Sequence, residues 1–219
     1  IFDLEYPLFD TIKSGVVKDI DFKHVNMVFP DSNQGDNVAT IARVIKDKTK
    51  IENVNVEGYL EGRDHVAGLV NNLEGNSEIE NISFTGKIKS KGCNSITAGI
   101  AGRNILSRVK RAYVNANIEV LGSTNSSMLV AVNGTTLNAS GGWGTWGRLT
   151  ESVAKGTLEI KRSGQAGGVT ATVWPYGAID KVVSYAKVTK GKELFGSDGD
   201  LNNNWFMQKI NNIFGVQGI

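Results

Sequence analysis

The chain repeats one pattern in two adjacent segments of 21 residues. The first, VATIARVIKDKTKIENVNVEG, covers Val38–Gly58, and the second, VAGLVNNLEGNSEIENISFTG, covers Val66–Gly86. Both contain IEN, then an alternation of apolar and polar residues, then a glycine. Internal repeats of this length are typical of solenoids, propellers and other arrays, in which a single unit cannot bury its own apolar face. The repeat therefore limits the possible folds more than composition does.

The pattern extends to further copies with the spacing apolar, two residues, apolar, one residue, apolar. Its positions are Val17/Ile20/Phe22, Ile51/Val54/Val56, Ile79/Ile82/Phe84, Val109/Ala112/Val114 and, more loosely, Val153/Gly156/Leu158 and Ile179/Val182/Ser184. A strict alternation follows in each copy, which predicts a strand. The next position on the same face is small (Gly58, Gly86, Ala116 and Ala186), which predicts a tight corner or a crowded interior.

A second apolar run of strand length precedes each copy, for example VATIA at 38–42 and ITAGIA at 96–101. We expect at least two strands per repeat, stacked in parallel on the equivalent strands of the next repeat. The predicted fold is all-β, a right-handed parallel β-helix of about six coils, since parallel crossovers are right-handed by default. Asn53 would lie over Asn81 in an amide ladder of structural importance.

Composition excludes several classes of protein. The 219 residues are 40% apolar, which is enough for a sizeable core, and the net charge of +2 does not suggest a nucleic-acid partner. The one cysteine, Cys93, excludes an intrachain disulfide, and no apolar run is long enough for a transmembrane helix. With two histidines and no HExxH, we expect neither a catalytic nor a metal site in this segment.

An insertion at about 133–148 interrupts the repeat and contains GGWGTWG at 141–147. Exposed aromatic residues are frequent anchors of protein contacts. Candidate partner contacts are Trp143, Trp146, Trp174 and Tyr176. Alternatively, the loop folds back so that its tryptophans cover one side of the solenoid.

The last residues depart from strand periodicity. In NWFMQKINNIFG, at 204–215, Phe206, Ile210, Ile213 and Phe214 have helical spacing, which predicts a short C-terminal helix. It would cap the last coil or begin another domain. We accordingly divide the chain into a β-helix at 1–195 and a linker with terminal helix at 196–219. The polar stretch at 196–204 resembles a calcium loop, but Asn203 and Lys209 occupy its glycine and glutamate positions.

β-Helices often act on polysaccharides, so a carbohydrate-active enzyme is an alternative by analogy of fold. Its candidate residues would be Glu151, Lys155, Asp180 and Lys181, but they do not recur as a cluster in successive copies of the repeat. Solvated turns are the simpler interpretation of these charges.

The units at 65–88 and 95–118 resemble GLUG-type repeats. Together with YPLFDTIKSGVVKDIDF at 6–22, they resemble the N-terminal region of the bacterial IgA1-specific zinc metallo-endopeptidases and their cell-surface paralogues. The resemblance implies a non-catalytic solenoid in a secreted, cell-wall-attached parent whose catalytic zinc lies elsewhere. It implies a spacer or a substrate-engaging domain, with a host glycoprotein such as immunoglobulin A as substrate. A stand-alone surface adhesin is the further alternative.

Overall fold

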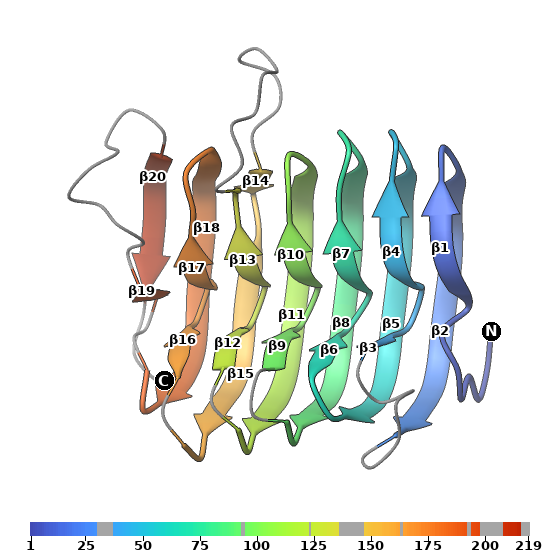
Figure 1. Cartoon of the computed structure of the whole chain (residues 1–219), viewed down its shortest axis with the longest axis horizontal. Coiled ribbons are helices and arrows are strands. Elements are labelled where there is room, and N and C mark those ends of the chain that lie inside the picture. Colours follow the sequence, from blue (N-terminus) through green and yellow to red (C-terminus); the bar gives the residue numbers. More distant parts are fainter. Residues whose placement is uncertain are drawn as a thin grey trace.

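The chain forms a parallel β-solenoid in which every turn stacks on the preceding one (Figure 1). The computed structural model describes residues 1–29, 37–92, 95–122, 124–135, 147–162, 164–191, 194–197 and 208–215. In this part of the chain all regular elements are strands, and all pairings between them are parallel. The predicted all-β parallel fold is confirmed.

Three sheets run along the solenoid. The long sheet contains β2 (Val16–Val28), β5 (Lys50–Gly62), β8 (Glu78–Ser90), β11 (Arg108–Val120), β14 (Gly147–Thr150), β15 (Val153–Ile160), β18 (Gly177–Thr189) and β20 (Gln208–Gly215). The middle sheet contains β1 (Phe9–Lys13), β4 (Ala42–Lys46), β7 (Val70–Leu73), β10 (Ala101–Asn104), β13 (Val130–Asn133), β17 (Thr170–Val173) and β19 (Phe195–Ser197). The short sheet contains β3 (Asn37–Ala39), β6 (His65–Ala67), β9 (Ser95–Ala98), β12 (Thr124–Ser127) and β16 (Gln165–Gly167).

Each full turn contributes one strand to the short sheet, so the five short-sheet strands among the described residues mark five full turns. This number is close to the expected six coils. The right-handed sense of the coil stays a prediction. Among the described residues, no helix is long and apolar enough to cross a membrane.

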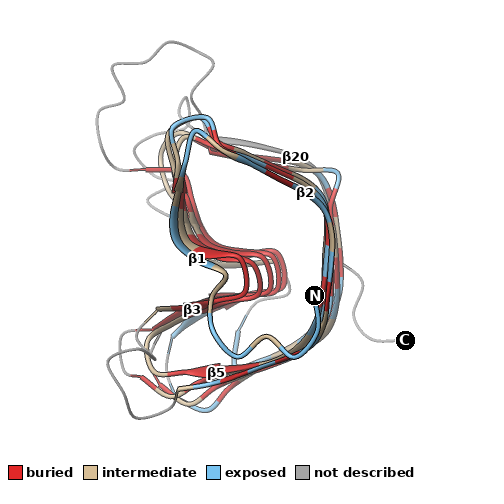
Figure 2. Ribbon diagram, turned by 90° about the vertical axis from the view of Figure 1, so that its right-hand side faces the viewer, coloured by how far each residue is buried: buried red, intermediate tan, exposed pale blue. Residues whose placement is uncertain are grey.

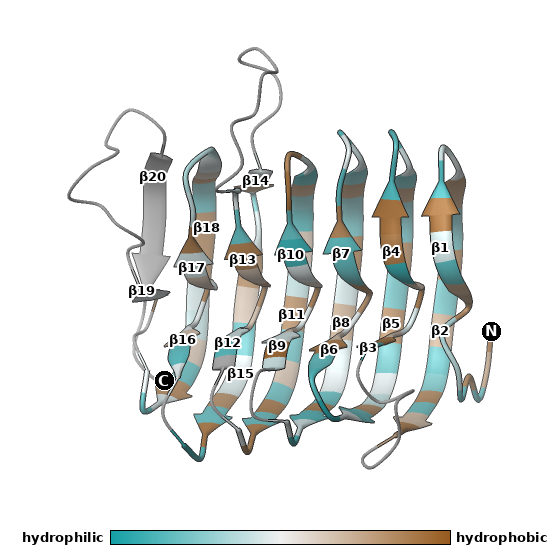
Figure 3. Cartoon of the chain, viewed as in Figure 1, coloured by the Kyte–Doolittle hydropathy of each residue, from teal (hydrophilic) through white to brown (hydrophobic). Residues whose placement is uncertain are grey.

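The register of the long sheet confirms the first four copies of the repeat. Val17 pairs with Ile51, Ile51 with Ile79, and Ile79 with Val109. The apolar positions form buried columns, and bands of similar hydropathy line up from strand to strand (Figure 3). The amide ladder is also present, because the Asn81 amide donates to Asn53 Oδ1 at 3.1 Å.

The fifth copy was predicted four residues too late. Val109 pairs with Leu149, and Leu149 in turn with Ile179, so the apolar triplet begins at Leu149 rather than at Val153. Its middle position is Ser152, which the apolar pattern does not reveal. The Ser152 hydroxyl accepts a hydrogen bond from the Ala112 backbone N–H at 3.1 Å, so this buried polar group is satisfied.

A corner follows the first apolar position in six successive copies of the repeat. The residue at this corner has a positive φ of 51–56° and is Asp19, Asn53, Asn81, Arg111, Glu151 or Lys181. Asn and Asp tolerate this left-handed conformation better than other residues with a side chain. The repeated IEN therefore supplies both the corner conformation and the amide ladder.

The second apolar run is not one strand, as predicted, but the end of a short-sheet strand, a corner and the start of a middle-sheet strand. The corner points into the interior of the coil (Figure 2). Its apolar residue is fully buried in every turn: Ile41, Leu69, Ile100, Leu129 and Val169. This column faces the long sheet closely, since a β-carbon at Gly68 would lie 2.8 Å from the Phe84 ring.

The predicted C-terminal helix is wrong for residues 208–215, which form β20 and extend the long sheet beyond β18. Residues 198–207 lie outside the described part of the chain. Ile210 pairs with Ile179 and Ile213 with Val182, so INNI is a further copy of the repeat. The spacing of three residues is common to a helix and to this repeat. The free edge of β18 decides between them because it offers backbone partners to a strand.

Candidate functional site

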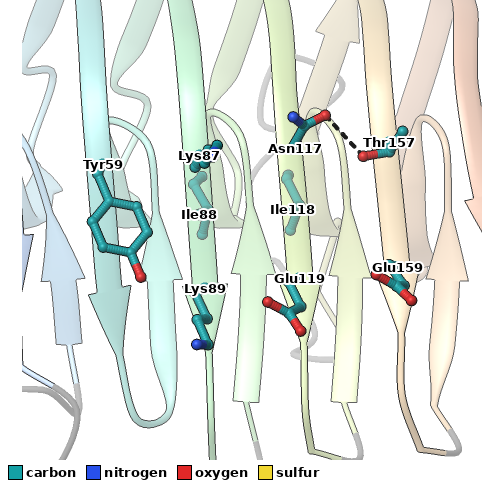
Figure 4. A pocket seen from close by; sticks show the side chains of 9 residues that line it. All are labelled: Tyr59, Lys87, Ile88, Lys89, Asn117, Ile118, Glu119, Thr157 and Glu159. Atoms are coloured by element: carbon teal, nitrogen blue, oxygen red, sulfur yellow. Dashed lines mark hydrogen bonds between the residues drawn. The ribbon is translucent and has the colours of Figure 1, made fainter.

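An open groove crosses the outer face of the long sheet over β5, β8, β11 and β15, with a volume of about 610 Å³ (Figure 4). The alternation of each strand directs one set of side chains to the core and the other to this face. The buried residues Ile88 and Ile118 lie between the outward side chains. Those outward side chains are Tyr59, Lys87, Lys89, Asn117, Glu119, Thr157 and Glu159.

The lining side chains form two rows across the strands. The first row runs through Tyr59, Lys87, Asn117 and Thr157, which pair in register from β5 to β15. The second row lies two residues further along each strand and runs through Lys89, Glu119 and Glu159. Each row thus presents one side chain per strand, at intervals of about 4.8 Å.

The Tyr59 hydroxyl is held at one end of the groove by Glu61. It donates a hydrogen bond to the Glu61 carboxylate, which also forms an ion pair with Lys91 at 2.6 Å. Burial of the phenol and its hydrogen bond to Glu61 raise the pKa of Tyr59 above its usual value. Burial alone would raise the pKa of Glu61, but hydrogen bonds from Lys91 and Tyr59 outweigh it and lower that pKa. The phenol therefore stays neutral and its ring is fixed in position.

Charges of both signs line the groove. Two lysines, Lys87 and Lys89, lie on β8, and two glutamates, Glu119 and Glu159, lie on β11 and β15. Glu159 also pairs with the exposed Lys161, whose pKa it raises. Between the charges, Thr157 donates a hydrogen bond to Asn117 Oδ1 at 2.9 Å. The groove is polar and close to electrically balanced.

An aromatic platform adjoins the groove on the same face. The ammonium group of Lys155 lies 5.8 Å from the centre of the Tyr113 ring and 5.9 Å from that of the Tyr185 ring. These distances are in the range of cation–π interactions. Tyr113 and Tyr185 are 37% and 45% exposed, so both rings are accessible from solvent.

Two of the four predicted partner contacts, Trp174 and Tyr176, lie in the turn between β17 and β18 and are half-buried. Their turn is bound to both ends of the insertion. Thr135 N–H donates to Pro175 O at 2.8 Å, and Gly147 N–H donates to Tyr176 O at 2.9 Å. Trp143 and Trp146 lie outside the described residues. Their role as a partner contact stays a prediction.

The four charged residues considered for a carbohydrate-active enzyme lie in two places on the long sheet. Asp180 precedes the corner residue Lys181, and its backbone oxygen accepts a hydrogen bond from Glu151 N–H at 3.1 Å. Glu151 and Lys181 occupy the corner column, where Glu151 lies 3.7 Å from Arg111. Lys155 instead lies between the two tyrosines of the aromatic platform. In the described part of the chain, no group of three or more His, Cys, Asp or Glu side chains is arranged to hold a metal ion.

Fold and repeat together define the class of protein as a parallel β-solenoid built from sequence repeats. Within this class, residues 1–58 match the family model described as the M26 IgA1-specific metallo-endopeptidase N-terminal region. The resemblance inferred from the repeats is confirmed: the chain is related to the N-terminal region of the IgA1-protease-like zinc metalloproteases.

Similarity to individual proteins covers nearly the whole chain. Over 219 residues, 100% of this chain and 11% of the relative, it is 36% identical to zinc metalloprotease ZmpB of Streptococcus pneumoniae serotype 4. Over 206 residues, 90% of this chain and 10% of the relative, it is 34% identical to zinc metalloprotease ZmpC of the same organism. An immunoglobulin A1 protease of Streptococcus sanguinis is 27% identical over 212 residues, 90% of this chain and 11% of the relative. The chain thus spans about a tenth of the length of these relatives.

Proposed function

We propose that this chain is a non-catalytic solenoid segment of a secreted, cell-surface zinc metallo-endopeptidase, and that it acts as a spacer that also engages substrate. The relatives named as zinc metalloproteases and immunoglobulin A1 proteases support the assignment of the parent. Zinc and the catalytic residues would lie in another part of that parent. The sequence of this chain contains no HExxH.

The observation that carries the spacer role is the unbroken stacking of the long sheet. Seven levels of strand, from β2 to β20, follow one another in parallel register, with β14 and β15 sharing one level. At about 4.8 Å per strand, six steps correspond to roughly 29 Å. The apolar residues of each level are buried against those of the neighbouring levels. The stack therefore resists bending, whereas a Gly/Ser-rich linker is flexible.

Substrate engagement is supported by the polar outer face rather than by the core. The groove and the aromatic platform occupy the same face of the long sheet, and neither is needed to close the interior. For the parent we propose a host glycoprotein such as immunoglobulin A as substrate, in accordance with the names of its relatives.

Binding is tested by passing immunoglobulin A1 over the immobilised chain. We expect binding that saturates, with serum albumin as the negative control. Absence of binding at high concentration would remove the substrate-engaging role and leave the spacer role.

The spacer role is tested in the full-length parent. Replacing this segment by an unrelated rigid solenoid of similar length should preserve cleavage by surface-attached enzyme, whereas a flexible Gly/Ser linker should not. Equal activity with the flexible linker would contradict a rigid spacer.

A further inference from the structure

We propose that the groove over β5, β8, β11 and β15 binds an uncharged oligosaccharide, which lies along the solenoid axis. The inference concerns this chain alone and does not depend on the nature of the parent. Its basis is the spacing, the chemistry and the charge of the lining residues.

The spacing of the groove favours a repeating ligand. Four adjacent strands contribute to it, which gives three intervals and a length of about 14 Å. A chain of pyranose units lying across the strands repeats at nearly the interval of the strands, so each sugar meets an equivalent position in the two rows. An extended peptide repeats at about 3.3 Å and would lose register with the rows within a few residues.

The side chains of the first row suit a sugar. An aromatic ring can pack against the apolar C–H face of a pyranose, and the Tyr59 ring is already held in place through Glu61. Asn117 and Thr157 bond to each other through one amide oxygen and one hydroxyl hydrogen, so the Asn117 NH₂ group and the oxygen lone pairs of Thr157 can serve a ligand. Together they offer the mixture of donors and acceptors that sugar hydroxyls need.

The charge of the groove favours an uncharged ligand. Lys87 and Lys89 are balanced by Glu119 and Glu159 across the same groove. A polyanion would gain from the lysines but would be repelled by the two carboxylates. The surface also lacks the one-sided basic character of a nucleic-acid site. Carboxylates and ammonium groups can all hydrogen-bond to neutral hydroxyls.

The aromatic platform gives a longer ligand a second place to bind. Lys155 precedes Thr157 by two residues on β15 and therefore projects from the same face. Tyr113 and Tyr185 flank Lys155 on the neighbouring strands. A branched or longer oligosaccharide could thus extend from the groove to these exposed rings.

Titration calorimetry of the 219-residue chain tests the proposal with four probes: cellotetraose, chitotetraose, tetragalacturonate and an extended tetrapeptide. We expect at least one of the two neutral tetrasaccharides to bind, and the acidic tetrasaccharide and the peptide to bind at least about tenfold more weakly, the ratio expected from about 1.4 kcal/mol. Failure of both neutral probes to bind, or preference for the acidic probe or the peptide, would overturn the inference.

Variants then locate the site. Asn117→Ala and Lys87→Ala should each weaken binding by about fivefold or more, the effect of one lost hydrogen bond. Lys18→Ala changes another exposed lysine of the long sheet and should leave affinity within about twofold. Equal affinity of the groove variants and wild type would place binding elsewhere and refute the assignment. Circular dichroism and thermal melting establish that each variant is folded, and Tyr59→Phe tests the hydroxyl while retaining the ring.

A neutral probe that binds can represent two natural sources. Neutral glycans released from a host glycoprotein and neutral oligosaccharides prepared from the bacterial cell wall are therefore compared on the same chain. The preparation that binds more tightly identifies the natural source of the ligand, and either result supports oligosaccharide binding in the groove. If the chain binds an oligosaccharide but does not bind immunoglobulin A1, the substrate-engaging role is contradicted and this inference is supported.

Discussion

Replacing Gly86 by alanine should destabilise the solenoid more than any ordinary Gly-to-Ala change in a strand. Gly86 has a φ of +142°, a region that residues with a side chain rarely adopt. A β-carbon there would lie 1.9 Å from the backbone oxygen of Gly58 and 2.9 Å from the Gly58 carbonyl carbon. Both are backbone atoms of the preceding turn, which cannot rotate away as a side chain can.

The magnitude follows from three contributions. Forcing alanine into an unfavourable φ costs about 1–3 kcal/mol. Overpacking a closed interior costs about 1–3 kcal/mol more. The lower entropy of the unfolded alanine chain returns about 0.4–1 kcal/mol. The free energy of unfolding should therefore fall by about 2–4 kcal/mol, and Tm by about 10 °C at 2–4 °C per kcal/mol.

Urea unfolding followed by far-ultraviolet circular dichroism measures this change. The matched control is Ala116→Gly, at the position that pairs with Gly86 on the next strand. Ala116 has no positive φ, so this variant should lose only about 0.5–1 kcal/mol. If Gly86→Ala is as stable as wild type, or if both variants lose the same amount, the argument from the close approach of neighbouring turns is wrong.

Four further predictions concern the core, the ladders and the titrating groups. Phe84→Ala should lower the free energy of unfolding by about 3–5 kcal/mol, because the ring is fully buried; a loss below about 1 kcal/mol in urea titration would contradict its place in the core. Asn104→Ala should cost about 1–3 kcal/mol in the same assay, since Asn104 donates to buried Asn133 at 2.7 Å, and an unchanged midpoint would show that this buried hydrogen bond contributes nothing. Lys181→Asn should stabilise the chain by about 0.5–1 kcal/mol, because Asn tolerates its φ of 54°, and a lower Tm would oppose this reasoning. The pKa of Glu61 is lower in the folded state, so its contribution to stability is complete above the unfolded value of about 4.3 and is lost as pH falls through the folded value. The stability difference between wild type and Glu61→Gln should accordingly shrink as pH falls below the unfolded value and through the lower folded pKa, and a constant difference would exclude this linkage.

The sequence contained most of the information needed for the fold. Apolar residues in alternation identified the strands, and the recurrence of IEN identified the amide ladder at Asn53 and Asn81. The left-handed corner at these two asparagines became visible only in the structure. The signal failed where a copy of the repeat replaced an apolar residue by a polar one. Ser152 hid the fifth copy in this way, and the i, i+3 spacing of Ile210 and Ile213 was attributed to a helix although it is also the spacing of the repeat.

The groove has no signature in the sequence of the kind that an insertion or a motif provides, because it lies within the regular repeat. Its residues, such as Tyr59, Lys87 and Asn117, share no residue type and lie 28 and 30 positions apart. The signal that the sequence does offer is position: each of these residues directly follows the small residue of its repeat and points outward. This signal can be recognised only when the register between successive turns is known.

The repeated pattern alone requires this chain to stack its strands, because each repeat has an apolar face that only another repeat can cover. The folded arrangement of the turns, by contrast, establishes which of the small positions require glycine. Gly86 and Gly156 have positive φ and lie within contact of the backbone of the preceding turn, while Ala116 and Ala186 occupy the same column without positive φ. The reason is that a backbone conformation and the distance between two turns depend on residues far apart in the chain, and a local pattern does not record them.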